Sequence, residues 1–208
     1  VSLEKKQPTL ITTMLQKLRS ELKADSIDCF YIGSGDAHLS EYIPESEGRR
    51  QAVSQFTGSA GTCLVTQNKA LLWTDGRYFL QASEQLSSDW TLMKAGNKGV
   101  PDIPTWIGDN LAKNSTVGVD ANLISAKEAG DLEKFLKGKS ITLKPVSGNP
   151  VDRIWADRPP APSNPVTVQA TAHAGTSHFK KISDLQAAIK EAKATACVIS
   201  MLDEICWL

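Results

Sequence analysis

The chain has 208 residues, enough for one or two domains with a hydrophobic core. Its 23 basic and 23 acidic side chains cancel, so charge gives no reason to expect nucleic acid or an anionic membrane as a partner. No apolar run approaches the roughly 18 residues that span a bilayer, and residues 2–8 lack the apolar stretch of a signal peptide. We therefore expect a cytoplasmic protein.

The four cysteines lie far apart in the sequence, and no two of them form a Cys-x-x-Cys pair. That spacing argues against a zinc knuckle or a thioredoxin-type motif. We expect reduced thiols buried in the core, as in a cytosolic protein, at Cys29, Cys63, Cys197 and Cys206.

The first elements alternate between helical and strand spacing. Apolar residues at helical spacing between Leu10 and Leu22, with Pro8 suited to a helix start, predict a helix. Residues 29–32 predict a short buried strand. Residues 62–66 and 70–74, joined by a short polar turn, predict a β-hairpin. Helical spacing then returns over residues 77–86.

The next elements continue this alternation. We predict strands over 90–93, 116–119 and 141–143, and a short helix over 106–111. Ser125 and Glu128 have the spacing of a capping box, in which each side chain satisfies a free backbone N–H of the other, and a helix follows them. The fold class is therefore α/β, with a mixed β-sheet flanked by helices.

A proline-rich segment divides the chain. Residues 157–165 hold four of the ten prolines, which indicates an extended linker or strap. We place one domain at residues 1–155. Residues 156–208 contain this linker, a predicted helix near 177–194 and one predicted strand at 196–200. One strand cannot build a sheet with two covered faces, so we interpret 156–208 as the truncated start of a second domain.

Motifs that would give this chain its own catalytic centre fail. The Gly33-Ser34-Gly35 segment follows a strand, but the third glycine of a dinucleotide fingerprint would fall at His38. Residues 58–61 lack the Gly-Lys-Ser/Thr ending of a phosphate loop and do not form a nucleophile elbow. The histidines show no His-Glu-x-x-His arrangement. We expect no catalytic residue, no metal ligand and no bound cofactor in this chain.

Polar side chains gather instead around three glycine-containing segments. Arg49-Arg50 fits a solvated helix face or a functional pair. Asp75-Gly76 indicates a turn in which the aspartate caps a helix. Arg77 follows that turn at the head of a helix, where the helix dipole disfavours a cation, so we expect a partner for it, either Asp36 or a group outside the chain. The candidates are Asp36, His38, Glu41, Tyr42, Arg49, Arg50, Asp75 and Arg77.

The order of several segments resembles the N-terminal portion of the aminopeptidase P (Xaa-Pro aminopeptidase) family, in its cytosolic three-domain form. Any one of these segments is weak evidence, whereas the ordered set is specific and covers nearly the whole chain. The segments are residues 35–42, Arg49-Arg50, 58–62, 73–81, 90–94, 117–120, 152–155 with 157–159, and 202–208.

The resemblance implies a creatinase-type N-terminal α/β domain, a similar middle domain and a C-terminal pita-bread catalytic domain that is absent here. In the family that last domain holds two divalent metal ions, usually manganese, which activate a hydroxide against the peptide bond before a proline in second position. The resemblance thus implies a metal-dependent Xaa-Pro aminopeptidase as the parent protein and no activity for this chain alone.

The resemblance also implies one functional residue and two partners. Arg77 matches the arginine that the family uses at the substrate entrance, so a proline-containing peptide is the implied ligand, and a homodimer is the implied assembly of the full-length protein. Two alternatives stay open. One is an inactive binding module, like the aminopeptidase-like module in the large subunit of the FACT histone chaperone. The other is an independent dimerisation module.

Overall fold

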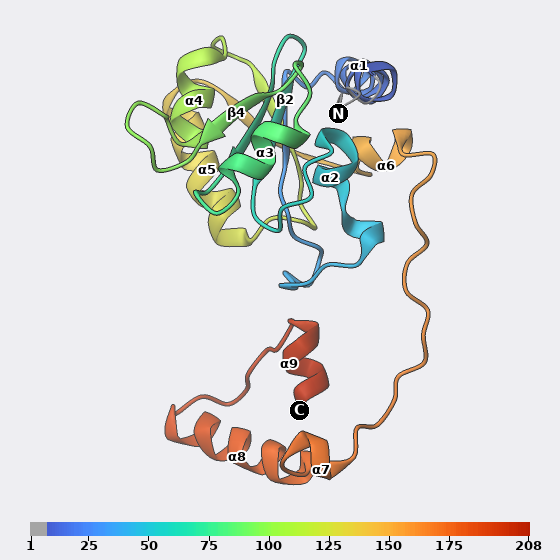
Figure 1. Cartoon of the computed structure of the whole chain (residues 1–208). Helices are drawn as coiled ribbons and strands as arrows, with labels where there is room; N and C mark the ends of the chain where they lie inside the picture. The colour runs from blue at the N-terminus through green and yellow to red at the C-terminus, as the bar shows by residue number, and fades with distance from the viewer. Residues whose placement is uncertain (1–7) are drawn as a thin grey trace.

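The computed structural model describes the backbone of residues 8–208 and side chains from Met14 onward. Residues 14–158 contain one six-stranded sheet, flanked by helices (Figure 1). Its strand order is β4-β3-β2-β1-β5-β6. The strands are β1 (Cys29–Ile32), β2 (Thr62–Thr66), β3 (Ala70–Thr74), β4 (Thr91–Lys94), β5 (Thr116–Asp120) and β6 (Thr142–Val146).

One strand makes the sheet mixed. β2 is antiparallel to both of its neighbours, β1 and β3, whereas the pairs β3–β4, β1–β5 and β5–β6 are parallel. The α/β class, the mixed sheet and the β2–β3 hairpin are confirmed. The last strand lies farther along the chain than predicted, because the Ile141 N–H donates back to the carbonyl of Leu136 at the end of the preceding helix and the pairing with β5 begins at Thr142.

Helices cover both faces of the sheet. One face carries α1 (Pro8–Ala24), α2 (Arg49–Ser54), α3 (Phe79–Gln85) and α6 (Pro150–Ile154), and the other carries α4 (Ile103–Asn110) and α5 (Ala126–Gly138). Leu15, Leu18 and Leu22 of α1 are buried at the predicted helical spacing, whereas the side chains of Leu10 and Ile11 lie outside the described residues. Helix α6 was not predicted, because it is only five residues long.

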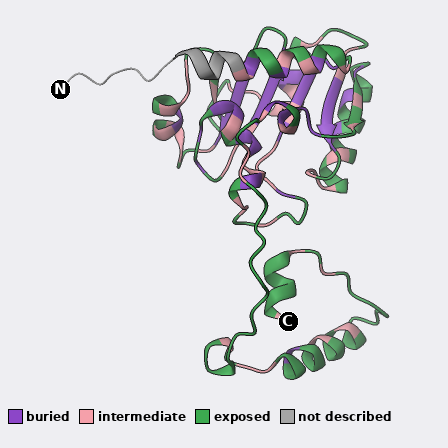
Figure 2. Ribbon diagram, turned by 90° about the vertical axis from the view of Figure 1, so that its right-hand side faces the viewer, coloured by how far each residue is buried: buried purple, intermediate pink, exposed green. Residues whose placement is uncertain are grey.

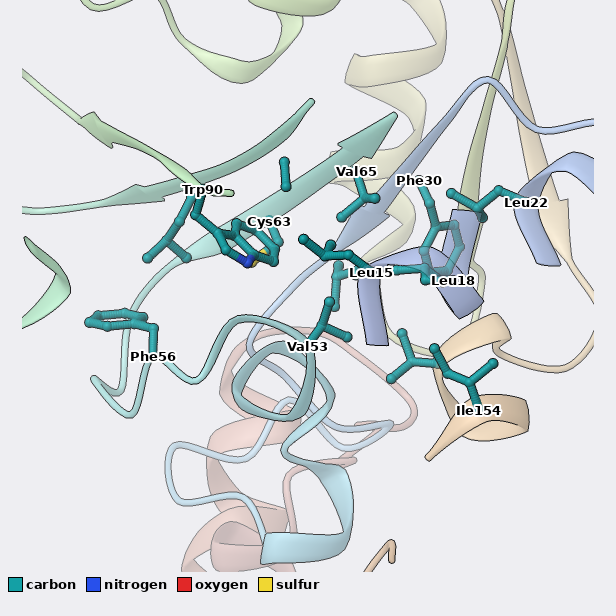
Figure 3. Close-up of a cluster of buried hydrophobic side chains, with 14 of the residues drawn as sticks. Leu15, Leu18, Leu22, Phe30, Val53, Phe56, Cys63, Val65, Trp90 and Ile154 are labelled. Carbon is teal, nitrogen blue, oxygen red and sulfur yellow. The ribbon is translucent and has the colours of Figure 1, made fainter. Parts of the chain in front are cut away.

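The strands feed two hydrophobic clusters by strict alternation. In β2, Cys63 and Val65 face the α1 side, and Leu64 between them faces α4 and α5. This is the period of two that strand geometry imposes, and it places buried side chains on both faces of the central strands. Figure 3 shows the α1-side cluster, in which Phe30 and Val65 of the sheet lie near Leu15 and Leu18 of α1.

The start of α5 confirms half of the predicted capping box. The Ser125 hydroxyl accepts the backbone N–H of Glu128 at 3.1 Å. The Glu128 carboxylate does not return the bond, because it accepts the Tyr31 hydroxyl at 2.6 Å instead. Burial and, to a smaller extent, this hydrogen bond raise the pKa of Tyr31. The helix cap is thereby tied to the central strand β1.

Residues 159–208 are built differently. An extended segment leads to α7 (Thr171–Ala174), α8 (His178–Glu191) and α9 (Leu202–Trp207) (Figure 1). The helix predicted at 177–194 is confirmed, but the strand predicted at 196–200 is wrong, since within residues 159–208, all of them described, no strand is present to pair with it. Figure 2 shows this region almost entirely exposed. None of the described helices is long and apolar enough to cross a membrane.

The prediction of four buried thiols is half right. Cys29 and Cys63 are fully buried in the two clusters, and burial raises the pKa of each thiol to about 12. Cys197 and Cys206 are exposed. Their apolar neighbours in sequence do not bury them, because the region that contains them has almost no core of its own.

Candidate functional site

One edge of the sheet brings the three polar segments together. β1, β3, β4, β5 and β6 all run in the same direction, so their carboxyl ends lie at one edge. The antiparallel β2 begins at that same edge. Residues 33–36 leave β1 there, residues 58–61 lead into β2 there, and residues 75–77 leave β3 there. Segments far apart in sequence therefore form one surface, the carboxyl edge of the sheet.

The Arg50 side chain connects the first two segments, residues 33–36 and 58–61, by hydrogen bonds. Its Nη1 donates to the Ser34 hydroxyl at 2.8 Å, and its Nη2 donates to the carbonyl of Gly58. The Ser34 hydroxyl in turn donates to the carbonyl of Gly61 at 2.5 Å. The two loops are thus held by side-chain hydrogen bonds rather than by a strand ladder.

Of the two interpretations of Arg49-Arg50, the solvated helix face is wrong. Both arginines are only 7% exposed. Burial lowers the pKa of Arg50, and among the described residues no carboxylate forms an ion pair with it. Carbonyl oxygens, and the Phe56 ring centroid 5.0 Å from the guanidinium carbon, surround the charge instead.

Aromatic side chains connect the 58–61 segment to the segment that contains Arg77. The Ser59 hydroxyl lies 2.6 Å from the Tyr78 hydroxyl. The rings of Tyr78 and Phe56 meet edge to face, with centroids 5.9 Å apart. Gly58 lies between these rings, and a Cβ atom there would approach Tyr78 Cδ1 to 2.7 Å. The backbone of the loop can occupy this position only without a side chain.

Arg77 lies at the surface of this edge, next to the Tyr78 ring, whose centroid is 5.2 Å from the guanidinium carbon. The Nε and Nη2 atoms of Arg77 each donate to the Asp75 carboxylate at 2.9 Å. This pairing lowers the pKa of Asp75 to about 2, with the side-chain hydrogen bond as the largest cause. The predicted pairing of Arg77 with Asp36 is therefore wrong, because Asp75 is its partner. The alternative partner, a group outside the chain, stays a prediction.

The pairing leaves one edge of the guanidinium available. A guanidinium carries five N–H groups in a planar fork, and Asp75 takes the edge formed by Nε and Nη2. Among the described residues, Nη1 of Arg77 donates to no group, and the Arg77 side chain is 69% exposed. Asp75 also accepts the backbone N–H of Arg77 at 3.1 Å, so it shapes the turn, although the residue that caps α3 is Tyr78.

Asp36 organises its own loop. Its Oδ1 accepts the backbone N–H of His38 at 3.0 Å and that of Ser40 at 2.9 Å. Burial favours a higher pKa for Asp36, but these hydrogen bonds outweigh it and lower the pKa. The Nδ1 atom of His38 lies 3.1 Å from the carbonyl of Ser200. Glu41 and Tyr42 come next in the chain, with Tyr42 88% exposed.

This edge presents groups that can donate hydrogen bonds to a ligand. Among the described residues, no group of three or more His, Cys, Asp or Glu side chains is placed to hold a metal ion. The groups that this edge offers are the half-paired guanidinium of Arg77 and the exposed side chain of Tyr42. Sequence reasoning missed Ser34, Ser59 and Tyr78, although each lies within a segment that it singled out. The available signal was the Gly-Ser pair that both loops share.

Comparisons with known proteins identify the family. A profile described as the creatinase/prolidase N-terminal domain matches residues 14–154, and a second profile of the same description matches residues 157–208. A probable Xaa-Pro aminopeptidase P of Sordaria macrospora is 45% identical over 95% of this chain, and aminopeptidase P2 of Arabidopsis thaliana is 48% identical over 88%. The chain spans 32% and 26% of these relatives, respectively.

Solved structures agree. The X-prolyl aminopeptidase of Caenorhabditis elegans, described as a cytosolic enzyme with a di-nuclear active site, superposes with a TM-score of 0.88 and 34% identity. The match covers 96% of this chain and 34% of the nematode enzyme, so both regions of the chain superpose together. The N-terminal domain of a cytoplasmic peptidase from Mycobacterium tuberculosis shares the fold alone, with a TM-score of 0.53 and 24% identity over 68% of this chain and 98% of that one. This chain belongs to the creatinase/prolidase N-terminal domain family, and it is similar to the N-terminal third of Xaa-Pro aminopeptidases.

Proposed function

We propose that this chain is the non-catalytic N-terminal part of a metal-dependent Xaa-Pro aminopeptidase, which removes the first residue from peptides with proline in second position. In this proposal the catalytic metals, two manganese ions, belong to a C-terminal domain outside the chain. The chain shapes the substrate entrance and contributes to a cytoplasmic homodimer. Its similarity to Xaa-Pro aminopeptidases over nearly its whole length supports this function.

The observation that carries the proposal is the half-paired guanidinium of Arg77. Asp75 fixes one edge of that guanidinium, so the other edge keeps a defined direction without a partner among the described residues. A planar fork of this kind donates two parallel hydrogen bonds to a carboxylate, or one to a peptide carbonyl. Arg77 thereby binds the peptide, and Asp75 orients Arg77.

The test uses the full-length protein with Arg77→Ala and Arg77→Lys. We expect Arg77→Ala to lower kcat/KM on an Xaa-Pro-Xaa peptide by roughly 10- to 100-fold, the loss expected for a charge-assisted hydrogen bond. The melting temperature and metal content should not change, because an exposed ion pair contributes little to stability. Arg77→Lys should recover only part of the loss, since an ammonium cannot bind both groups as a fork.

The matched control is Lys139→Ala. Lys139 is a half-exposed cation that also pairs with an aspartate, Asp109 at 3.6 Å, but it follows the C-terminal end of α5 at the opposite edge of the sheet. This variant should keep wild-type kcat/KM. An Arg77→Ala enzyme that also keeps wild-type kcat/KM would remove Arg77 from the substrate entrance. A full-length protein without Xaa-Pro peptidase activity would instead contradict the proposed function itself.

A further inference from the structure

Four charged side chains form a closed ring where the first domain meets the strap. Arg49 donates its Nε and Nη2 atoms to the Asp152 carboxylate at 2.6 and 2.9 Å. Arg49 also pairs with Glu47, and Arg158 pairs with Glu47 at 3.0 Å and with Asp152 at 2.9 Å. Two arginines and two carboxylates thus alternate around the ring, with no net charge.

The ring lies in partly dry surroundings. The Arg49 side chain is 8% exposed, and the other three side chains are between 22% and 29% exposed. Burial favours a lower pKa for Arg49, but its hydrogen bonds to Asp152 and Glu47 outweigh burial and raise the pKa. Removing one member would leave a partly buried charge without its partner, which is more costly than losing an exposed pair.

Arg158 is the member that belongs to the strap. Besides its two ion pairs, its Nε donates to the carbonyl of Ser46 at 2.7 Å, and its guanidinium carbon lies 6.0 Å from the Trp155 ring. One side chain therefore contacts the short 3-10 helix η1 (Glu45–Glu47), α6 and the turn after α6. Several contacts in different directions define an orientation, which a single pair cannot do.

The proline-rich segment after Arg158 transmits that orientation. Pro159 and Pro160 come next, and Pro162 and Pro165 lie within five more residues. Proline-rich segments are extended and semi-rigid, about 3.1 Å per residue, so a direction fixed at their base persists over several residues. Residues 159–170, which continue the strap, form no helix or strand, and nearly all of them are exposed. The direction of the strap can therefore be fixed only where it begins, at Arg158.

The ring also connects to the candidate site. Arg49 and Arg50 are neighbours in α2, and their side chains bind different parts of the chain. Arg49 binds the base of the strap through Asp152, whereas Arg50 binds the loops at the carboxyl edge of the sheet. The same short helix holds both the strap and the edge that presents Arg77.

We propose that Arg158, with Asp152, Arg49 and Glu47, is a clamp that fixes the direction in which the strap leaves the first domain. The clamp thereby sets where residues 171–208, and whatever the chain carries beyond them, lie relative to Arg77. This makes Arg158 a positioning residue that touches no substrate. The inference concerns the geometry of the chain and holds whether or not the proposed function is correct.

A pair of spin labels on this chain tests the clamp. The labels are placed at two exposed positions, Glu84→Cys in α3 and Ser163→Cys in the strap, with Cys197 and Cys206 changed to serine. Cys29 and Cys63 are buried and stay unlabelled. With the clamp intact we expect a narrow distance distribution. Arg158→Gln should broaden it by about twofold or more, because only the stiffness of the strap and the exposed His38–Ser200 contact then restrain its direction.

The matched control is Arg153→Gln. Arg153 lies in α6 next to Asp152 and also binds two carboxylates, Glu21 at 2.6 Å and Asp25 at 2.5 Å, but these contacts join α6 to α1 within the first domain. It should leave the distribution narrow. The proposal is overturned if Arg158→Gln leaves the width unchanged, or if Arg153→Gln broadens it equally. Circular dichroism checks that each variant is folded, and Arg158→Lys, which keeps the charge but loses the fork, should give an intermediate width.

Discussion

Helices α5 and α8 are alike in local sequence and differ in what surrounds them. They have 13 and 14 residues, and each begins after a serine whose hydroxyl accepts a backbone N–H three residues later. In α5, Leu132 and Leu136 are buried against the sheet. In α8 the single buried residue is Lys181, whose ammonium lies 4.4 Å from the Trp207 ring centroid and donates to the Trp207 carbonyl.

The difference shows that capping and helical spacing predict where a helix lies but supply only a small part of its stability. A helix of about a dozen residues is marginal in water and depends on packing of its apolar face. The second region leaves its large apolar side chains in solvent: Phe179 is 75% and Trp207 60% exposed. We therefore expect the first region to have the stability of a domain and α8 to be stabilised by little more than its own helix propensity.

Hydrogen exchange gives the largest contrast. We expect the amides of α5 to exchange at least about 1,000-fold more slowly than those of α8, because α5 opens with the whole domain and α8 opens locally. Mass spectrometry after limited exchange and pepsin digestion measures both helices in one sample. Equal protection would contradict the comparison and would show that residues 171–208 are stabilised by contacts that burial does not reveal.

Matched leucine truncations give the next largest effect. Leu136 is fully buried in α5, so Leu136→Ala should lower the free energy of unfolding by about 2–5 kcal/mol through lost burial and a cavity. Leu185 in α8 is half-buried, and Leu185→Ala should change that free energy by less than about 0.5 kcal/mol. Urea denaturation followed by tryptophan fluorescence measures both. A comparable loss in the two variants would mean that the regions unfold as one unit.

The two serine caps give the smallest contrast. Ser125→Ala should lower the stability of the first domain by about 1 kcal/mol, the usual contribution of an N-cap. Ser177→Ala removes the same kind of bond, a 3.3 Å contact to the Lys180 N–H, and should reduce the helicity of α8 without moving the main melting transition. Circular dichroism at 222 nm during a thermal ramp separates the two results. If Ser177→Ala shifts the main transition, α8 unfolds together with the first domain, which would contradict the comparison.

Most of the first domain could be predicted from sequence because its signals are local. Period-two alternation in residues 62–66 and 70–74 and the serine cap at position 125 each need only neighbouring residues, and each is confirmed. The strand predicted at 196–200 had a similar local pattern. It failed because a strand also needs a hydrogen-bonding partner, and a local pattern cannot say whether one exists.

The site was predicted only as a set of segments. Their meeting at one edge results from the strand directions, which the sequence pattern does not contain. The burial of Arg49 and Arg50 was missed because their partners are distant: Arg49 binds Asp152, 103 residues away, and Arg50 binds backbone carbonyls. Pairings over such distances are decided by tertiary structure. The role of Arg77 in peptide binding stays a prediction, and so does the domain boundary near residue 155.

The glycine at position 58 offers a way to screen related sequences. A side chain there would collide with Phe56 and Tyr78. A homologue that keeps both aromatic residues but replaces Gly58 must therefore have rebuilt this loop, even where Arg77 itself is retained. Among duplicated genes, the residue at position 58 can therefore distinguish copies that keep this loop from copies that have lost it. A comparison of catalytic residues alone would find no difference between such copies.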